Sequence, residues 1–492
     1  MKRLTTLLTV IAVFALAATG QIQDESLGFE LPSRAGKAGF NIARPMQVRP
    51  ASDADTTKIV ARDVTVSRAG ELADLLGDDK LIVDSLVVRG PINDADFNTL
   101  WEAGFYGDLE VLDLASASIE GNRIPKSAFF HKDIQIDSAN NIFYVLILEK
   151  IVLPDAVTEM GDSAFYYNRL LTSINMPKQL KRIGKSTFKN CRRLTFGQLI
   201  LPEGFEETDN LSFWNCEINS DVIFPSSIER IGRDAFAYSR LTGFEIPADA
   251  RCQIDMGAFC ETRCLKKDVI IPNGCEIIGW GHFWGSYVEN VVLPEGMNCI
   301  PDMFLVDAKY LQSVKIPSTV KSIDNSAFLT CTRLKSIELP DGLEEIDMHG
   351  LAQMHSLQSI NFPKNLKRLG DSSCWEWDSI KVIYSQNPIP PECEPGVYQS
   401  QTPFGYYDGS TTTPRDTPLY VPVGSADKYR NAYGWNYFTN IIETDKFPSA
   451  IEGIDADEGM ADQPIYDLMG RRVEHPRKGQ IYICGGKKYM VR

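Results

Sequence analysis

The sequence predicts a β-rich α+β solenoid, in which short units stack edge to edge. A proline ends an apolar triplet at ten places, with spacings of 22 to 25 residues. These prolines are Pro154, Pro177, Pro202, Pro225, Pro247, Pro272, Pro294, Pro317, Pro340 and Pro363. A phenylalanine recurs at the same interval. Because a unit of about 23 residues cannot bury its own apolar side, neighbouring copies must share one core.

Each unit is expected to contribute one β-strand. Two regular copies begin at Leu311 and Leu334 and share the frame L-x-x-I-x-L-P-x-x-L-x-x-I-x-x-x-A-F-x-x-C. Alternation in the L-x-x-I-x-L segment turns the isoleucine and the last leucine inward and the residue between them outward. The proline then ends the strand.

The recurring phenylalanines predict an internal spine of stacked rings. They are Phe165, Phe188, Phe213, Phe236, Phe259, Phe283, Phe304 and Phe328. Three positions after each ring comes a small polar residue, which is expected to hydrogen-bond the turn backbone. These residues are Asn168, Cys191, Cys216, Ser239, Thr262, Ser286, Asp307 and Cys331.

The chain has eleven cysteines. The three in this polar slot are expected to be ladder thiols rather than disulfide partners. A disulfide stays open for those in less regular copies, namely Cys252, Cys260, Cys264, Cys275 and Cys299.

This periodic frame resembles the leucine-rich repeats of Bacteroidetes surface proteins, the BspA-like group. The resemblance covers roughly residues 146–383, and the segments 86–90 and 109–114 resemble the family's N-terminal cap. Segments 419–424 and 433–435 resemble the segment that closes such arrays. The resemblance implies a leucine-rich-repeat array between two caps, and a binding role at the cell surface.

The chain is expected to divide into seven segments. Residues 1–20, with Lys2 and Arg3 before an apolar stretch, are typical of a secretory signal peptide. Residues 21–58 form a flexible leader, and 59–145 form an N-terminal cap and a first degenerate repeat, with helices near Leu72 and Phe97. The array spans 146–383, and the C-terminal cap spans 384–445, with a short helix capped by Ser425. An acidic linker at 446–463 and a small β module at 464–492 complete the chain.

Charge and hydropathy restrict the partners. The net charge of −15 argues against nucleic acid, which binds basic surfaces, and against anionic lipid. After the signal peptide no apolar run approaches the ~18 residues of a membrane-spanning helix. We therefore expect a secreted protein without membrane insertion, located outside the cell or on its outer surface.

Motifs for catalysis or metal binding are incomplete. The segment that begins at Gly184 resembles part of a phosphate loop, but the position that requires the first glycine of that loop holds Gln179. The same segment recurs in other units, where it is expected to be a turn. The acidic run 455–459 misses the spacing of a calcium loop, and the five histidines lack zinc spacing. Cys374 with His355 would form a thiol dyad, but Cys374 occupies the spine slot. We expect no enzyme activity, no metal and no cofactor.

The exposed surface is the remaining candidate for function. The outward strand positions, named here the outward row, are Val152, Asn175, Ile200, Ile223, Glu245, Ile270, Val292, Lys315, Glu338 and Asn361. The first seven are mostly apolar and would make a stripe on the order of 30 Å long, of a kind that usually marks an interface. Two structural alternatives stay open. Either β-branched residues simply suit strands, or the 25-residue copies shift the register and bury these side chains.

The binding candidates are therefore Val152, Ile200, Ile223, Ile270 and Val292. Trp280 and Trp284 are either exposed aromatic anchors or turn packing. The leading hypothesis is an adhesin-like protein that recognises an extracellular protein or glycan of a host or neighbouring cell. The alternative is a structural envelope component with no soluble ligand.

Overall fold

The computed structural model describes residues 60–130, 146–396, 401–406 and 413–448, and the backbone of seven further strands. The predicted signal peptide lies outside the described residues, as do the leader apart from 41–43 and most of the linker and of the C-terminal β module. The chain separates into two units, residues 1–48 with 132–145, and residues 49–131 with 146–492.

The smaller unit contains a three-stranded sheet in the order β1-β8-β7. Its strands are β1 (Asn41–Ala43), β7 (Ile136–Asp137) and β8 (Ile142–Tyr144). A separate four-stranded sheet near the C-terminus has the order β32-β35-β34-β33. Its strands are β32 (Gly453–Ile454), β33 (Ile465–Tyr466), β34 (Ile481–Cys484) and β35 (Lys487–Val491).

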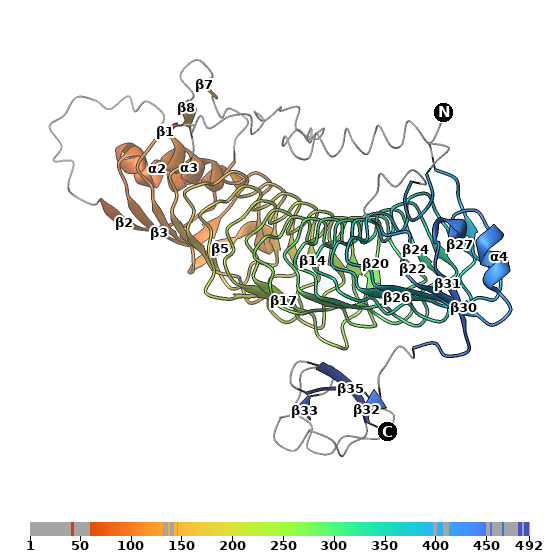
Figure 1. Ribbon diagram of the computed structural model, residues 1–492. Helices are drawn as coiled ribbons and strands as arrows, with labels where there is room; N and C mark the ends of the chain where they lie inside the picture. Colours follow the sequence, from red (N-terminus) through yellow and green to blue (C-terminus); the bar gives the residue numbers. More distant parts are fainter. Residues whose placement is uncertain are drawn as a thin grey trace. The chain divides into compact units, whose positions relative to one another are not determined.

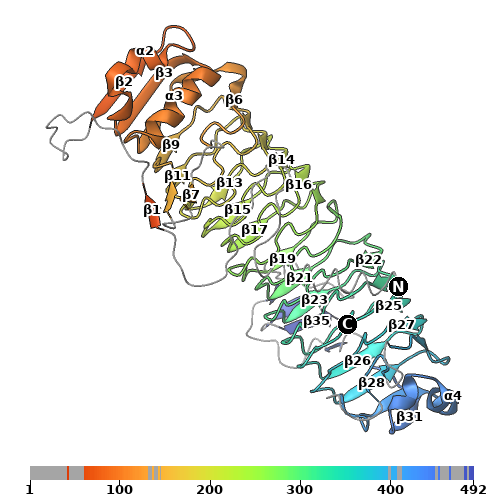
Figure 2. The same cartoon turned by 90° about the horizontal axis from the view of Figure 1, so that it is seen from above.

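The larger unit contains a solenoid of parallel coils, which confirms the predicted fold class (Figure 1). The first ladder of strands is the predicted one, and its members follow one another along the coils (Figure 2). They are β2 (Ala61–Thr65), β3 (Ser85–Ile92), β4 (Val111–Asp113), β9 (Lys150–Val152), β11 (Ser173–Ile174), β13 (Leu199–Ile200), β15 (Asp221–Ile223), β17 (Gly243–Glu245), β19 (Val269–Ile270), β21 (Asn290–Val292), β23 (Ser313–Lys315), β26 (Ser359–Phe362), β28 (Val382–Ser385), β30 (Leu419–Pro422) and β31 (Ile441–Thr444). The short β5 (Ala117–Ile119) pairs with β3.

A second ladder, which the repeat frame did not predict, comes from the x-x-I segment after each proline. Its strands have two residues each, so one coil carries two strands rather than one. They are β6 (Arg123–Ile124), β10 (Glu159–Met160), β12 (Arg182–Ile183), β14 (Glu207–Thr208), β16 (Arg230–Ile231), β18 (Gln253–Ile254), β20 (Glu276–Ile277), β22 (Cys299–Ile300), β24 (Ser322–Ile323), β25 (Glu345–Ile346), β27 (Arg368–Leu369) and β29 (Glu392–Cys393).

The spine of phenylalanine rings is confirmed. Phe165 stacks on Phe188 with 5.3 Å between ring centroids and 6° between planes, and Phe188 stacks on Phe213 at 5.2 Å. All three rings are fully buried. Stacked rings give the core dispersion contacts that no single coil could make.

The assignment of two residues to these slots was wrong. A regular spine residue donates its N–H to the residue before the next ring, as Phe236 does to Ala258. Phe283 donates instead to Phe304, so Leu305 occupies the spine slot and Ala308 the polar slot. Phe304 packs edge-on to Phe283, and the predicted polar-slot residue at position 307 is partly exposed. The sequence did not reveal this one-residue offset, because Phe304 and Leu305 are adjacent and either apolar side chain could fill the spine slot.

The backbone N–H groups of the spine turns donate hydrogen bonds alternately to the next coil and to their own coil. Ser163, Phe165 and Tyr167 donate their N–H groups to the next coil, while the residues that follow each of them donate three positions back. Ser163 and Tyr167 have φ of 55° and 64°, and equivalent positions in later coils share this left-handed conformation. The glycine before the turn permits close stacking, because a Cβ at Gly232 would lie 2.7 Å from the backbone of the previous coil.

The predicted ladder thiols are confirmed for Cys191, Cys216 and Cys331. Each thiol contacts a spine carbonyl of the coil before it, as in the 3.1 Å bond from Cys191 to Phe165. Thr262 and Ser286 bond the carbonyl of their own coil's ring at 2.7 Å. The amide nitrogen of Asn168 and the hydroxyl of Ser239 are buried without a partner, so the prediction fails for these two.

Helices lie at both ends of the described solenoid. α2 (Leu72–Leu76) and α3 (Asp94–Phe105) confirm the two expected near the N-terminal end, and Asn93 and Asp96 form a capping box on α3. α4 (Ala426–Asn431) confirms the third, but Ser425 does not cap it with its side chain. Glu443 accepts from the Ala426 N–H instead, at 2.9 Å. Three 3-10 turns complete the helical elements of the described residues: Gly77–Leu81, Glu120–Asn122 and Trp435–Tyr437.

The first ladder is interrupted after β11, after β17 and after β23. The first two interruptions coincide with the 25-residue spacings in the sequence, which end at Pro202 and at Pro272. The third falls within regular 23-residue spacings, and there only an isolated bridge from Ser336 to Ser359 leads to β26.

At the first interruption both extra residues lie between Cys191 and β13. At the second, one lies between Pro247 and β18 and the other between Thr262 and β19. A length count therefore locates the first two breaks but not the third.

Candidate functional site

The outward row lies on the solvent side of the first ladder. Ile200 is 56% exposed and Val152 is 42% exposed, whereas Leu199 and Leu201, the neighbours of Ile200, are buried. Alternation along the strand thus places Ile200 outside and its neighbours inside. The other three aliphatic candidates, Ile223, Ile270 and Val292, are half-buried.

Residues of the outward row stand opposite one another on adjacent strands. Ile200 pairs with Ile223, and Ile270 pairs with Val292. Ile200 and Ile270 each follow a 25-residue copy, and neither is buried. The alternative that these copies shift the register and bury the row is therefore wrong. Whether the row binds a ligand stays a prediction.

The outward row extends further than the proline frame predicted. Asn361 stands opposite Tyr384, which in turn stands opposite Tyr420. The two tyrosine rings stack at 5.1 Å with 20° between their planes. Phe447 meets Tyr384 edge-on at 6.4 Å. The 23-residue step from Asn361 to Tyr384 could have shown this, although the proline frame has decayed there.

Trp280 and Trp284 lie on the spine turns and not on the strands that carry the outward row. Trp280 is 38% exposed, and its carbonyl accepts a hydrogen bond from Gly257 of the previous coil. Trp284 is half-buried, and its carbonyl accepts from Glu261. The structure therefore does not bring the two tryptophans together with the aliphatic candidates.

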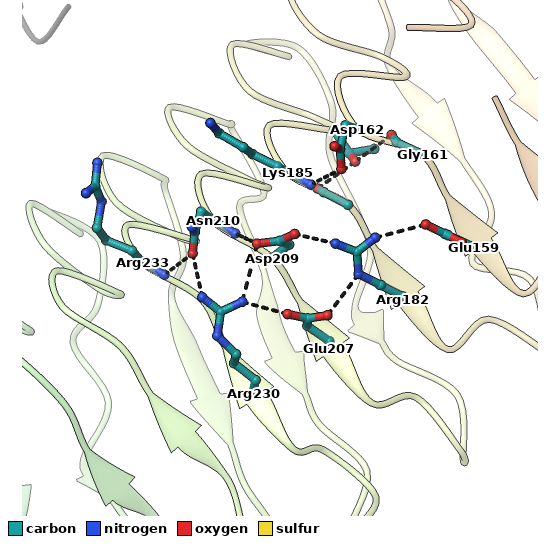
Figure 3. A network of polar contacts seen from close by, with 12 residues as sticks. Glu159, Gly161, Asp162, Arg182, Lys185, Glu207, Asp209, Asn210, Arg230 and Arg233 are labelled. Atoms are coloured by element: carbon teal, nitrogen blue, oxygen red, sulfur yellow. Dashed lines mark hydrogen bonds and ion pairs between the residues drawn. The ribbon is translucent and has the colours of Figure 1, made fainter. Parts of the chain in front are cut away.

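From β6 to β16 the first residue of each strand in the second ladder is charged and alternates in sign, and we name β6 to β20 the charge ladder. Arg182 contacts Glu159 of the previous coil at 2.9 Å and Glu207 of the next coil at 2.8 Å (Figure 3). It also forms an ion pair with Asp209. One guanidinium thus links three consecutive coils.

Arg230 repeats this arrangement two coils further on. It contacts Glu207 at 2.6 Å, and it donates to the Asn210 side chain at 2.8 Å (Figure 3). It also contacts Asp255 at 2.6 Å. Burial lowers the pKa of Arg230, but the hydrogen bonds to Glu207 and Asp255 outweigh it, so the pKa lies above its usual range. The cation is therefore held by carboxylates of this chain.

A similar group lies near the C-terminal end of the second ladder. Arg368 contacts Glu345 and Glu394, each at 2.9 Å. All three arginine groups escaped prediction from the sequence, because the repeat frame indicated only one strand in each unit. The usable signal was a charged residue one position before the second isoleucine of the frame, alternating in sign from copy to copy.

A groove of about 190 Å³ lies at the N-terminal end of the charge ladder. Arg123, Lys126, Glu159, Asp162 and Arg182 contribute to its lining. Cavities that hold small ligands usually measure about 300–1,000 Å³, so this groove is small. Within the described residues, no cluster of three His, Cys, Asp or Glu side chains is placed to hold a metal.

The thiol dyad considered in the sequence does not form. Cys374 is fully buried in the spine slot, and burial raises the pKa of its thiol. The His355 ring lies 2.8 Å from Asp378 instead. No helix among the described residues has the length and apolar character to cross a membrane.

Two ladders, a ring spine and a 23-residue register define the class: this is a leucine-rich-repeat solenoid. The family model described as "BspA type Leucine rich repeat region" matches residues 137–266 and 252–381 with six copies. The chain is thus a BspA-type leucine-rich-repeat protein.

Solved structures of repeat proteins resemble this chain at low identity. A leucine-rich repeat protein from Bacteroides ovatus is 20% identical, with a TM-score of 0.47, over 66% of this chain and 87% of its own. The pneumococcal vaccine antigen PcpA is 16% identical, with a TM-score of 0.34, over 67% and 86%. A leucine rich cell surface protein from Faecalibacterium prausnitzii is 21% identical, with a TM-score of 0.34, over 63% and 84%. No curated protein sequence matches the chain.

Proposed function

We propose that this chain is an exported, non-catalytic binding protein of the cell surface, adhesin-like, which recognises an extracellular protein or glycan through its outward row. The observation that carries the proposal is the exposure of Ile200 and Val152 on strands of the first ladder. Burying exposed aliphatic surface drives association, and parallel strands present it without the entropy cost of a flexible loop.

The polar and aromatic part of the same row supports an interface of mixed chemistry. The stacked Tyr384 and Tyr420 continue the row beyond Asn361. Tyrosine is enriched at interfaces because its ring is apolar and its hydroxyl is polar. The predicted signal peptide at residues 1–20 supports export. The net charge of −15 favours a partner other than nucleic acid.

The test is a glycan and extracellular-matrix array probed with the full chain after removal of the signal peptide. A ligand found there is titrated against the double variant Ile200→Lys with Ile223→Lys. We expect at least a tenfold loss of affinity, because two lysines would have to be desolvated at the contact.

The matched control is Ile278→Lys, because Ile278 is 38% exposed beside the charge ladder rather than on the outward row. It makes the same change of side chain, and its affinity should equal that of the unaltered protein. Equal binding by the double variant would reject the outward row as the binding face. If the array gives no ligand, and if the protein stays in the envelope fraction after salt extraction, the structural alternative would be favoured.

A further inference from the structure

The second interruption of the first ladder leaves two coils poorly connected on that side. β17 and β19 belong to consecutive coils, but they form no strand pair. On the other side of the same two coils, β18 pairs with β20 through Gln253 with Glu276 and Ile254 with Ile277. The spine also joins these coils, because Phe259 donates its N–H to His282 and its ring stacks on Phe283. On the side of the first ladder, the ion pair of Lys267 with Asp221 crosses the interruption without a strand pair.

The first interruption is reinforced by charge. There β11 and β13 are unpaired, and Arg182 on β12 forms ion pairs with Glu207 and Asp209 of the next coil. At the second interruption the corresponding pair of side chains is Gln253 and Glu276, whose contact measures 3.4 Å. A neutral amide at that distance is a weak substitute for an arginine.

Cys252 and Cys275 lie at this second junction, each immediately before its strand. The register of β18 and β20 places them at equivalent positions in consecutive coils. Both are buried, and their sulfur atoms are 2.9 Å apart. Neighbouring parallel strands lie ~4.8 Å apart, which falls within the Cα separations that a disulfide spans.

The two thiols differ from the ladder thiols in their partners. Cys191, Cys216 and Cys331 bond backbone carbonyls, whereas Cys252 and Cys275 contact each other. Within the described part of the chain no other pair of cysteine sulfurs makes such a contact. The pair is thus singled out by geometry among the cysteines left open by the sequence.

We infer that Cys252 and Cys275 form a disulfide that ties these two coils where the first ladder is interrupted. The inference rests on the proposed export for its setting, because disulfides persist in oxidising compartments. It assigns the junction a covalent link in place of the arginine pairs found at the first interruption.

The reaction requires a disulfide oxidant, such as glutathione disulfide. A hydrogen bond from Cys252 lowers the pKa of the Cys275 thiol, which favours Cys275 as the attacking thiolate. Cys275 attacks glutathione disulfide and releases one glutathione thiolate. Cys252 then loses its proton to solvent, attacks the Cys275 sulfur and releases the second glutathione. The protein loses two protons and two electrons, and glutathione disulfide is reduced to two thiols.

Peptide mapping tests the link directly. The full chain is refolded in a glutathione redox buffer, its free thiols are alkylated under denaturing conditions, and it is digested with trypsin without reduction. We expect peptide 252–263 joined to peptide 268–309, and separation of the two on reduction. Each peptide holds one further cysteine, Cys260 or Cys299. The Cys260→Ser and Cys299→Ser variants should therefore keep the joined peptide, and Cys252→Ser should lose it.

Thermal unfolding gives a second readout. Reductant should lower the Tm of the unaltered protein by a few degrees and leave the Tm of Cys252→Ser unchanged, because the link restricts the unfolded chain. Deuterium uptake should rise on reduction in 268–285 and stay constant in 182–201. Complete alkylation of both cysteines, or a joined peptide that survives in Cys252→Ser, would overturn the inference. Because the oxidation is carried out in vitro, its outcome is independent of ligand binding and of export.

Discussion

The two ladders of the solenoid differ in whether the side chains on their outer face have partners within the chain. On the charge ladder, Arg182 and Arg230 are held by carboxylates of adjacent coils. On the outward row, Ile200 and Val152 are left in solvent. The difference teaches that a ladder whose charges pair within the chain stabilises the contacts between consecutive coils. The exposed aliphatic groups of the outward row would gain further burial on contact with the proposed ligand.

The largest expected effect comes from the core that both ladders share. Phe213 is fully buried and stacks on Phe188 and Phe236 at 5.2 Å on each side. Phe213→Ala should lower the free energy of unfolding by about 3–5 kcal/mol, because it removes the ring and leaves a cavity. Urea denaturation followed by circular dichroism measures this. Phe213→Leu, which keeps most of the volume, is the control and should lose much less.

The next effect concerns pH and two groups on the turns, outside either ladder. His282 Nε2 lies 3.2 Å from the Ile254 carbonyl and 3.0 Å from that of Ile278. Burial lowers the pKa of this imidazole to about 4, from 6.5. As pH falls from 6.5 to 4, the unfolded chain takes up the proton first. The contribution of His282 alone should therefore lower stability by about 3 kcal/mol across that window.

Asp234 works in the opposite direction. Burial raises the pKa of its carboxyl to about 6, from 3.8, so the folded chain takes up the proton first as pH falls. The two contributions nearly cancel in the unaltered protein. Between pH 4 and 7, the unfolding free energy should therefore rise as pH falls in His282→Gln and decrease as pH falls in Asp234→Asn. A slope in His282→Gln identical to that of the unaltered protein would remove His282 as a contributor.

A smaller effect is expected on the charge ladder. Arg230→Ala leaves Asp255 without its cation and Glu207 with Arg182 alone, and we expect a loss of about 1–2 kcal/mol. The loss should shrink at high salt, because screening weakens the original attraction. Lys178→Ala is the control, since its pair with Asp155 is largely exposed, and it should have no measurable effect.

The smallest effect on stability is expected on the outward row. Ile200→Lys with Ile223→Lys should change the free energy of unfolding by less than about 0.5 kcal/mol, because Ile200 is exposed and Ile223 is half-buried. The free energy of unfolding of the double variant is measured by denaturation and compared with that of Ile278→Lys. A loss of several times that size would show that the row packs inside the protein, where no partner can reach it.

The fold was predictable from the sequence because the same frame is repeated many times. Prolines and inward residues of the L-x-x-I-x-L segment identified the first ladder, and the rings identified the spine. The x-x-I strands of two residues escaped notice, because alternation over so short a segment carries no periodic signal. Their pairing arises only when coils stack, so Arg182 and Glu207 meet through tertiary structure.

The candidate site was predictable only in part. Exposure of Ile200 follows from strand alternation, and its alignment with Ile223 follows from the repeat length. The continuation to Tyr384 and Tyr420 was missed because the proline frame ends at Pro363. The contact of Cys252 with Cys275 could not be foreseen, since it depends on the register around an interruption.

Hydroxyl-radical footprinting of the chain, free and with an array-identified ligand, tests the central claim most directly. Ile200 on the outward row and Ile278 beside the charge ladder are both exposed, so both should be oxidised in the free protein. We predict that the ligand protects Ile200 and leaves Ile278 unchanged. Protection of Ile278 with continued oxidation of Ile200 would contradict the assignment of the outward row as the binding face.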